Sequence, residues 1–540
     1  MPVRVRPGVS AYHRRMARWS IVVGVWALAL AAGVTVATES RWWLIVALPL
    51  FALAVTGPWD LTQRRHNVLR NYPILGHARF LLERIRPEIQ QYFVESQTDG
   101  TPFDRETRDL VYERAKGTLD EEPFGTERDV HAVGYEFMTH SLRARLAPAE
   151  TPTVRLGGPD CTRPYDIALL NVSAMSFGSL SANAIEALNA GAARGGFAHD
   201  TGEGGISRYH RKHGGDLIWE IASGYFGCRT PDGNFDPDQF AAKASDDQVK
   251  AISVKLSQGA KPGFGGVLPG AKVTAEIAEA RGVPIGETVT SPPAHRAFGT
   301  PVELIDFVTR LRQLSGGKPV GFKLCVGSRV EFLAICKAML ERDVTPDFVI
   351  VDGAEGGTGA GPVEFEDHMG MPLTEGLIIV HNALVGAGLR DRVKIGASGK
   401  VASGADIVKR IIQGADFTLA ARAMMFAVGC IQAQKCHTNR CPVGVTTQDP
   451  ARTRALDVPD KTARVARFQQ ATVASAKQMV ASMGLDSFAE LTPSMLNRRI
   501  DGVITRTYAE LYEWLEPGAL LDHAPADWRR DWQAADAARF

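Results

Sequence analysis

The stretch Phe348-Val-Ile-Val-Asp352-Gly-Ala-Glu-Gly-Gly-Thr-Gly359 decides the fold, because a short apolar run passes directly into a glycine-rich loop. A continuous apolar run of this length is typical of a strand buried on both faces, as in a parallel sheet. The loop lacks the G-x-G-x-x-G spacing of a dinucleotide-binding fingerprint and follows a late strand. Backbone with so few side chains allows a flat ring system to approach the main chain.

The same pattern, an apolar run that ends in a glycine-rich turn, recurs from about residue 164 onward. The other runs lie at 168–173, 196–198, 252–256, 320–324, 394–396 and 417–420. Stretches with helical periodicity separate many of them, at 182–193, 301–314, 329–341 and 405–413. About eight such units over roughly 280 residues favour a (β/α)8 TIM barrel over an open sheet, although 217–226 is ambiguous. We therefore predict an α/β barrel whose strand carboxyl ends build the site.

The loops at these carboxyl ends indicate what the barrel binds. Ser398-Gly399-Lys400 and Ala421-Arg422 follow the last two strands, where barrel enzymes commonly bind a phosphate. Any one glycine loop has the simpler explanation of turn geometry, but the loops as a set favour a ligand. A flat ring and a phosphate, beside the cysteine motif described next, together predict FMN.

Three of the seven cysteines, Cys430, Cys436 and Cys441, fall within twelve residues, and a proline follows the last. Clustered thiolates are typical of a soft metal, and three sulfurs predict a [3Fe-4S] cluster or an open zinc site. A zinc site completed by His437 is less favoured, because that residue directly follows Cys436 and would strain a shared tetrahedron. The four scattered cysteines indicate buried thiols in a reducing compartment.

Two uncharged apolar runs near the start, 21–37 and 42–55, predict a two-helix transmembrane hairpin. Arginines flank the pair on both outer sides, which places both ends in the cytoplasm: Arg4, Arg6, Arg14, Arg15 and Arg18 before it, and Arg64, Arg65 and Arg70 after it. We expect a two-pass protein of the inner (cell) membrane with its catalytic domain in the cytoplasm. The alternatives are a buried core hairpin and a signal peptide, which fits poorly because a second apolar run follows.

The predicted organisation has four parts, with helical additions on both sides of the barrel. Residues 1–60 form the membrane hairpin, with helices at about 20–37 and 42–57, and 61–150 form a cytosolic collar. Residues 151–450 form the barrel with the cysteine motif, and 451–540 form a helical extension. The formal charge of +1 gives no bulk electrostatic case for nucleic-acid binding.

From about residue 150 to 480 the chain resembles the FMN-binding synthase domain of glutamate synthases. The whole chain resembles the shorter, membrane-anchored members of that family. The matching motifs are ordered and specific: Ser173-Ala-Met-Ser-Phe-Gly-Ser179, Thr201-Gly-Glu-Gly-Gly205, Gln258-Gly-Ala-Lys-Pro-Gly263, Leu268-Pro-Gly270, Ser291-Pro-Pro293, Gly356-Gly-Thr-Gly-Ala360 and Gly429 to Gly444.

The resemblance implies a mechanism in which electrons enter through the cluster and reduced FMN delivers a hydride to an imine. That imine forms from 2-oxoglutarate and ammonia, and its reduction gives L-glutamate. The implied cluster ligands are the three cysteines, and the implied catalytic residues are Lys323, Lys261 and Gln258. Lys323 matches a family lysine near substrate and flavin. The alternative interpretation is that Lys323 only forms a salt bridge at the barrel mouth. The implied FMN-binding residues are Ser173, Ala174, Met175, Ser176, Gly356, Gly357, Thr358, Ser398, Gly399, Lys400, Ala421 and Arg422.

Departures from the family pattern leave the substrate and partners open. The family loop Gly-Ala-Lys-Pro-Gly-Glu-Gly-Gly has Phe264 here in place of the glutamate, which favours another amino or keto acid, such as an N-alkylated amino acid. Glutamine-dependent members of the family begin with a nucleophilic cysteine in an amidotransferase domain, whereas no cysteine precedes Cys161 here. We therefore expect free ammonia, a separate amidotransferase or another amine as the nitrogen source. No pyridine-nucleotide domain is evident, so we expect a ferredoxin or a separate reductase as electron donor. A non-catalytic membrane electron relay is a further alternative.

Overall fold

The computed structural model describes residues 8–540, with side chains from Trp19 onward. The chain forms two compact units, of which the first ends at Ser96 and the second runs from Gln97 to Phe540. Arg4 and Arg6, which the hairpin prediction used as flanking charges, lie outside the described residues.

Eight parallel strands of the second unit, all within the described residues, close into a barrel, which confirms the predicted (β/α)8 TIM fold. Their order around the barrel is β4, β5, β6, β7, β10, β11, β12 and β13, and β13 pairs with β4. Their bounds are β4 Leu170–Val172, β5 His199–Asp200, β6 Leu217–Ile221, β7 Val249–Lys255, β10 Val320–Leu324, β11 Phe348–Asp352, β12 Lys394–Ser398 and β13 Phe417–Ala420. The stretch at 217–226, which the sequence pattern left ambiguous, thus contains the remaining barrel strand, β6.

Helices cover the outside of the barrel, and each of the four helical stretches predicted within it coincides with one of them. The bounds are α6 Ala182–Gly195, α7 Arg208–Arg211, α8 Pro237–Ala244, α10 Pro301–Leu314, α11 Arg329–Arg342, α13 Leu373–Gly386, α14 Gly404–Ile412, α15 Arg422–Ala427 and α17 Val458–Ser482. Side chains of Ser181, Thr300 and Ser403 accept backbone N–H groups at the starts of α6, α10 and α14. These caps explain why the helices begin where the sequence pattern predicts.

Apolar side chains fill the amino-terminal half of the barrel. The hairpin of β2 (Thr153–Leu156) and β3 (Tyr165–Ala168) contributes to this inner core, in which the rings of Phe348 and Phe417 are fully buried. Two glycines make room for these rings. A Cβ at Gly321 would lie 2.2 Å from the Phe348 carbonyl oxygen, and one at Gly396 would lie 2.6 Å from the Phe417 ring. The apolar plug leaves the carboxyl half of the barrel for polar side chains.

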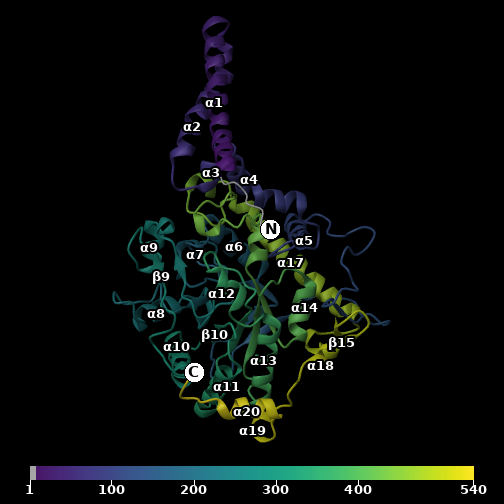
Figure 1. Cartoon of the computed structure of the whole chain (residues 1–540). Coiled ribbons are helices and arrows are strands. Elements are labelled where there is room, and N and C mark those ends of the chain that lie inside the picture. The colour runs from purple at the N-terminus through teal and green to yellow at the C-terminus, as the bar shows by residue number, and fades with distance from the viewer. Residues whose placement is uncertain (1–7) are drawn as a thin grey trace, which may run out of the picture. The chain divides into compact units, whose positions relative to one another are not determined.

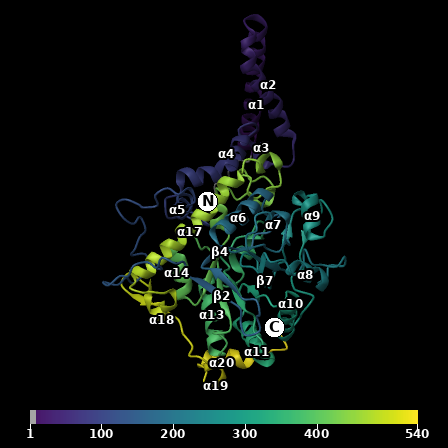
Figure 2. The same cartoon turned by 180° about the vertical axis from the view of Figure 1, so that it is seen from behind.

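Smaller elements surround the barrel, and the carboxyl-terminal segment packs against it. The additional bounds are α5 Arg105–Lys116, β1 Glu136–Met138, β8 Val267–Leu268, α9 Ala275–Arg281, β9 Val289–Thr290, α12 Val363–His368, α16 Pro450–Thr453, β14 Leu496–Arg499, β15 Thr505–Thr507, α18 Tyr508–Leu511, α19 Ala519–Asp522 and α20 Ala526–Ala534. Helix α17 contacts α5, α6 and α14 (Figure 2). Helix α20 contacts α11, where Arg329 lies 4.5 Å from the ring centroid of Trp528 (Figure 1).

All regular elements of the first unit from Gly8 onward are helices, joined by short turns. Helices α1 (Gly8–Thr38) and α2 (Leu44–Thr62) pack together, with a short 3-10 turn at Arg41–Trp43 between them. Helices α3 (Asn67–Asn71) and α4 (Gly76–Ile89) follow, and a π-helical turn spans Gln90–Val94. Two segments, Trp19–Thr38 and Arg41–Thr62, are long and apolar enough to cross a bilayer. Core helices of soluble proteins and signal sequences meet the same criteria, so membrane insertion stays a prediction.

Candidate active site

A buried group of charged side chains occupies the carboxyl end of the barrel. Lys323 of β10 forms an ion pair with Glu220 of β6, and their side chains are only 5% and 1% exposed. Lys255, at the end of the intervening strand β7, lies with its Nζ 3.9 Å from Glu220 Oε1 and 3.1 Å from Glu203 Oε2. The three strands are neighbours and their alternating side chains face inward at this level, so the charges meet inside the barrel.

The pKa shifts follow from burial and from these neighbours. Burial alone would lower the pKa of Lys323, but Glu220, Asp200 and Asp352 hold it above its ordinary value, so Lys323 is a cation. Burial, assisted by Glu220, raises the pKa of Asp200 to about 8. Asp200 Oδ1 accepts the N–H of Gly202 at 3.0 Å, while Oδ2 has no partner among the described residues. Asp200 therefore holds a proton at neutral pH, close to a fixed cation.

The three predicted catalytic residues differ in their surroundings. Lys323 lies at the centre of the charged group, and Gln258 joins its edge by accepting a hydrogen bond from Lys255 Nζ at 2.6 Å. Lys261 instead donates to the carbonyl of Ala360 in the glycine-rich loop at 2.7 Å. Its ammonium is 5.3 Å from the ring centroid of Phe264. The structure thus places Lys323 and Gln258 in one polar network, whereas Lys261, on the same loop as Gln258, contacts the glycine-rich loop after β11.

The twelve residues predicted to bind FMN follow β4, β11, β12 and β13, and these four strands are consecutive around the barrel. Ser173 and Ser398 meet there, with their hydroxyl oxygens 3.0 Å apart, and the Ser173 N–H donates to the Ala420 carbonyl at 3.0 Å. The charged group is built mostly from the other four strands, β5, β6, β7 and β10. The barrel mouth therefore has a glycine- and serine-rich half and a charged half.

Close approach of main chains explains why loops in both halves of the mouth need glycine. A Cβ at Gly202 would lie 2.6 Å from the Ser176 nitrogen, so the loop after β5 packs directly on the segment Met175–Ser176. The neighbouring Ala174 is half-buried. A Cβ at Gly259 would lie only 1.8 Å from the Gly353 carbonyl oxygen, which joins the loops after β7 and β11. At these two points the backbones of neighbouring loops pack directly on each other.

Two cations stand at the ends of β12 and β13, beside the glycine-rich loop. Arg422 donates to the Glu355 carbonyl at 2.7 Å, and a Cβ at Gly357 would lie 3.0 Å from its side chain. Burial lowers the pKa of Lys400, and the nearby charge of Arg422 lowers it further. Two cations that repel each other beside bare backbone form a site that fits a phosphate. Gly356, Thr358, Gly399 and Ala421 belong to the same loops and complete the predicted set.

The cysteine segment lies against the glycine-rich loop. A Cβ at Gly359 would lie 3.9 Å from Cβ of Cys436, and the segment continues directly from α15. Three thiols have the right chemistry for a soft metal. Among residues 19–540, however, no group of three or more His, Cys, Asp or Glu side chains is placed to hold a metal ion. The [3Fe-4S] cluster on Cys430, Cys436 and Cys441 therefore stays a prediction.

Sequence reasoning missed most of the charged half of the mouth. Asp200, Glu220 and Lys255 belong to none of the matching motifs and lie within the strands β5, β6 and β7. One signal was available, because a lone acid inside the fully buried run Leu217–Ile221 needs a partner in the core. The partner itself, on a strand a hundred residues later, depends on the barrel order.

The closed barrel with a polar carboxyl mouth defines the class of the protein, a TIM-barrel enzyme. Residues 144–486 match the family model described as the conserved region in glutamate synthase. Because this match covers more than half of the chain, the protein belongs to the glutamate synthase family. The predictions of family and of a glutamate synthase-like oxidoreductase are confirmed at this level.

Two relatives illustrate the extent of the similarity. The glutamate synthase large subunit-like protein YerD of Bacillus subtilis is 36% identical over 501 residues, which are 85% of this chain and 95% of that protein. An archaeal-type glutamate synthase (NADPH) of Thermotoga neapolitana is 33% identical over 320 residues, which are 59% of this chain and 60% of that protein. Among solved structures, a flavocytochrome b2 mutant with pyruvate bound aligns over 86% of this chain and 96% of its own, with 13% identity. Its TM-score of 0.41 is too low to bear on function.

Proposed function

We propose that this protein is an FMN-dependent oxidoreductase that forms L-glutamate by reducing the imine of 2-oxoglutarate and ammonia. The observation that carries the proposal is the two-sided barrel mouth. One half offers bare backbone and two cations, and the other holds the buried Lys323 with Glu220 and a protonated Asp200. Membership of the glutamate synthase family supports the same reaction class.

The glycine- and serine-rich half is the part of the chain that would hold FMN. Ser173 and Ser398, which face each other in this half, would contact the flavin, and Lys400 and Arg422 would neutralise its phosphate. Gly357 leaves room beside the Arg422 side chain that a Cβ would narrow. When bound, FMN supplies the hydride for the reduction.

The charged half is the part that would hold the substrate. The cation of Lys323 is fixed by Glu220, so it can pair with a substrate carboxylate without reorganising. Asp200 keeps a proton on its carboxyl group beside that cation, which suits it to protonate a nitrogen in the mouth. Lys261 binds the Ala360 carbonyl and so ties the loop after β7 to the glycine-rich loop beside the site.

A second candidate substrate is an amino or keto acid with an apolar or N-alkyl group. Phe264 and Phe365 form an edge-to-face pair with ring centroids 5.4 Å apart, and Phe264 keeps 39% of its surface exposed. Phe264 lies on the loop that also carries Lys261, and Phe365 lies in α12. Substituting Phe264→Glu tests the choice, since a carboxylate there would disfavour an apolar substituent and leave 2-oxoglutarate turnover unchanged or higher.

We further propose that Cys430, Cys436 and Cys441 bind a [3Fe-4S] cluster and that electrons come from a ferredoxin or a separate reductase. The contact of Cys436 with Gly359 supports a location near the flavin loop. Free ammonia or a separate amidotransferase would supply the nitrogen. Iron and acid-labile sulfide in anaerobically purified protein support this assignment, whereas zinc without iron would refute it.

We also propose that α1 and α2 anchor the enzyme in the inner membrane, with the barrel in the cytoplasm. The segment Trp19–Thr38 has 20 residues and would span about 30 Å, the thickness of the hydrocarbon core. Exposed tryptophans stand at both ends of the pair, with Trp42 and Trp43 at the turn and Trp59 near the end of α2. Aromatic residues at these levels are typical of membrane interfaces.

The direct test of the proposed reaction uses the full chain in detergent, purified without oxygen and supplied with reduced ferredoxin. Glutamate formation from 2-oxoglutarate and ammonia is the expected result. An enzyme that contains flavin but forms no glutamate would refute the first substrate assignment. An absorption spectrum insensitive to every amino and keto acid tried would favour the electron-relay alternative.

A further inference from the structure

Helix α4 presents an exposed apolar stripe that its own unit leaves uncovered. Every residue from 81 to 90 is exposed to solvent. Leu82, Ile85 and Ile89 follow one another at helical spacing, and the exposed Tyr92 and Phe93 extend the stripe into the next turn. Large apolar side chains gathered on one helix face mark an interaction surface.

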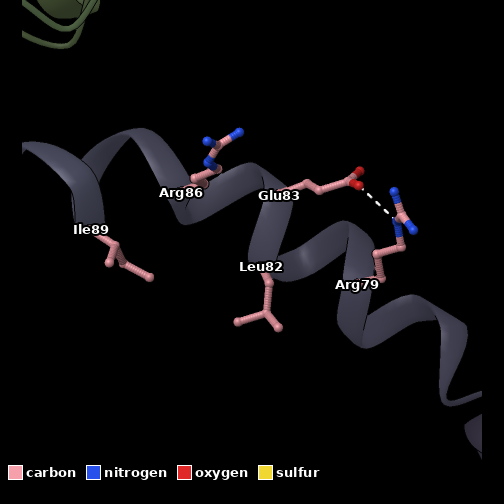
Figure 3. A pocket seen from close by; sticks show the side chains of 5 residues that line it. All are labelled: Arg79, Leu82, Glu83, Arg86 and Ile89. Atoms are coloured by element: carbon pink, nitrogen blue, oxygen red, sulfur yellow. Dashed lines mark hydrogen bonds and ion pairs between the residues drawn. The ribbon is translucent and has the colours of Figure 1, made fainter. Parts of the chain in front are cut away.

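Charged residues flank the stripe on the same face of α4. Arg79, Glu83 and Arg86 line one pocket together with Leu82 and Ile89 (Figure 3). Arg79 pairs with Glu83 at 2.8 Å. Residues 63–90 carry six arginines and two glutamates, a net charge of +4, although the whole chain carries only +1. An apolar stripe beside concentrated arginine is the pattern of a helix that lies in a lipid interface.

The start of α4 is fixed to the end of the second candidate membrane span. Asp60, fully buried near the end of α2, accepts the Ile74 N–H at 2.8 Å and lies 3.0 Å from His77 Nε2. Gly57 of α2 adds a close contact, because a Cβ there would lie 3.3 Å from the Ile74 side chain. If α2 spans the bilayer, this connection holds the first turn of α4 at the membrane surface.

We propose that α4 lies in the cytoplasmic lipid interface, with the stripe Leu82, Ile85 and Ile89 among acyl chains and its arginines on anionic headgroups. This inference rests on the proposed membrane anchoring of α1 and α2. The helix gives the enzyme a second, charge-selective contact with the membrane, beside the hairpin. Arg84 and Arg86 are the arginines not engaged with Glu83, and each favours an anionic surface by roughly fivefold.

The test is hydrogen–deuterium exchange of the full chain in lipid nanodiscs, either of phosphatidylcholine alone or with phosphatidylglycerol added. We expect residues 79–93 to exchange about 25-fold more slowly with the anionic lipid, from two arginines at roughly fivefold each. Substituting Leu82→Asp together with Ile89→Asp should remove this protection. The matched control is Leu119→Asp, which changes a leucine of the second unit that is 82% exposed and should leave the protection intact.

The outcomes separate this inference from the anchoring on which it rests. Rapid exchange of residues 21–37 in nanodiscs would overturn the anchoring and the inference together. Protection of 21–37 with equal exchange of 79–93 in both lipids would overturn the inference alone. Protection of 79–93 that persists in the Leu82→Asp, Ile89→Asp variant would also overturn it, because that protection would not depend on the apolar stripe.

Discussion

Removing the charge of Lys323 separates a catalytic role from a structural salt bridge. In Lys323→Met, Glu220 remains as a carboxylate with a 1% exposed side chain and only the more distant Lys255, 3.9 Å away. Breaking a buried pair by removing one partner costs about 3–5 kcal/mol, and the remaining lysine places this case near 3 kcal/mol. In a domain of this size each kcal/mol lowers Tm by about 2 °C, so the expected loss is about 6 °C.

The double variant Lys323→Met, Glu220→Met removes both charges and replaces them with apolar groups of similar volume. Such replacements are often close to neutral, so most of the lost Tm should return. Turnover should not return, because the cation that would bind the substrate carboxylate is missing in both variants. Loss of such an electrostatic contact typically lowers kcat about 100- to 1,000-fold.

The assay pairs thermal unfolding, followed by flavin fluorescence in detergent, with glutamate formation at saturating substrate. A double variant that regains both Tm and turnover would refute the catalytic role and leave Lys323 as a salt bridge. A single variant with unchanged Tm would refute the burial argument itself.

Three further predictions follow from the site. Asp200→Asn should remove the alkaline decline of activity near pH 8, because the folded protein holds a proton on Asp200 below about that pH. It should also flatten the loss of stability between about pH 4 and 8, a window in which the unfolded chain has released that proton and rising pH favours unfolding. Gly259→Ala should lower Tm by a few degrees, since its Cβ would meet the Gly353 carbonyl oxygen at 1.8 Å, whereas Gly327→Ala, with nothing within 4 Å, should not. Cys436→Ser should abolish bound iron and leave the flavin content unchanged.

Each of these three predictions would be contradicted by a specific result. An unchanged pH profile in the Asp200 variant, by rate or by unfolding, would show that this carboxyl is not the titrating group. Equal Tm in the two glycine variants would mean that the loops after β7 and β11 can separate freely. Iron retained after loss of Cys436, measured by metal analysis, would remove that residue from the ligand set.

Much of the barrel is readable from sequence because buried parallel strands and amphipathic helices leave local periodic signals. The glycine loops are equally local, since close backbone approach requires a missing side chain at a given position. Glu220 was missed because its role comes from its ion pair with Lys323. The two side chains meet only once the barrel has closed. A strand such as β6, with an acid inside an apolar run, is too short for its periodicity to distinguish a strand from a helix or a loop.

The carboxyl-terminal tryptophans show the same limit. Nothing in the sequence around Trp528 and Trp532 indicates what these side chains contact. Their rings lie beneath Arg329 and Lys337 of α11, at 4.5 and 5.0 Å from the cations. Cation–ring contacts between segments two hundred residues apart leave no local pattern, so only the folded chain assigns them.

The most direct test of the account is a single turnover of the anaerobic protein with its flavin reduced beforehand. The account predicts FMN bound in proportion to protein, with its visible absorbance restored when 2-oxoglutarate and ammonia are added together and an equal amount of glutamate formed. Protein without flavin, or absorbance that stays bleached with both substrates present, would contradict it.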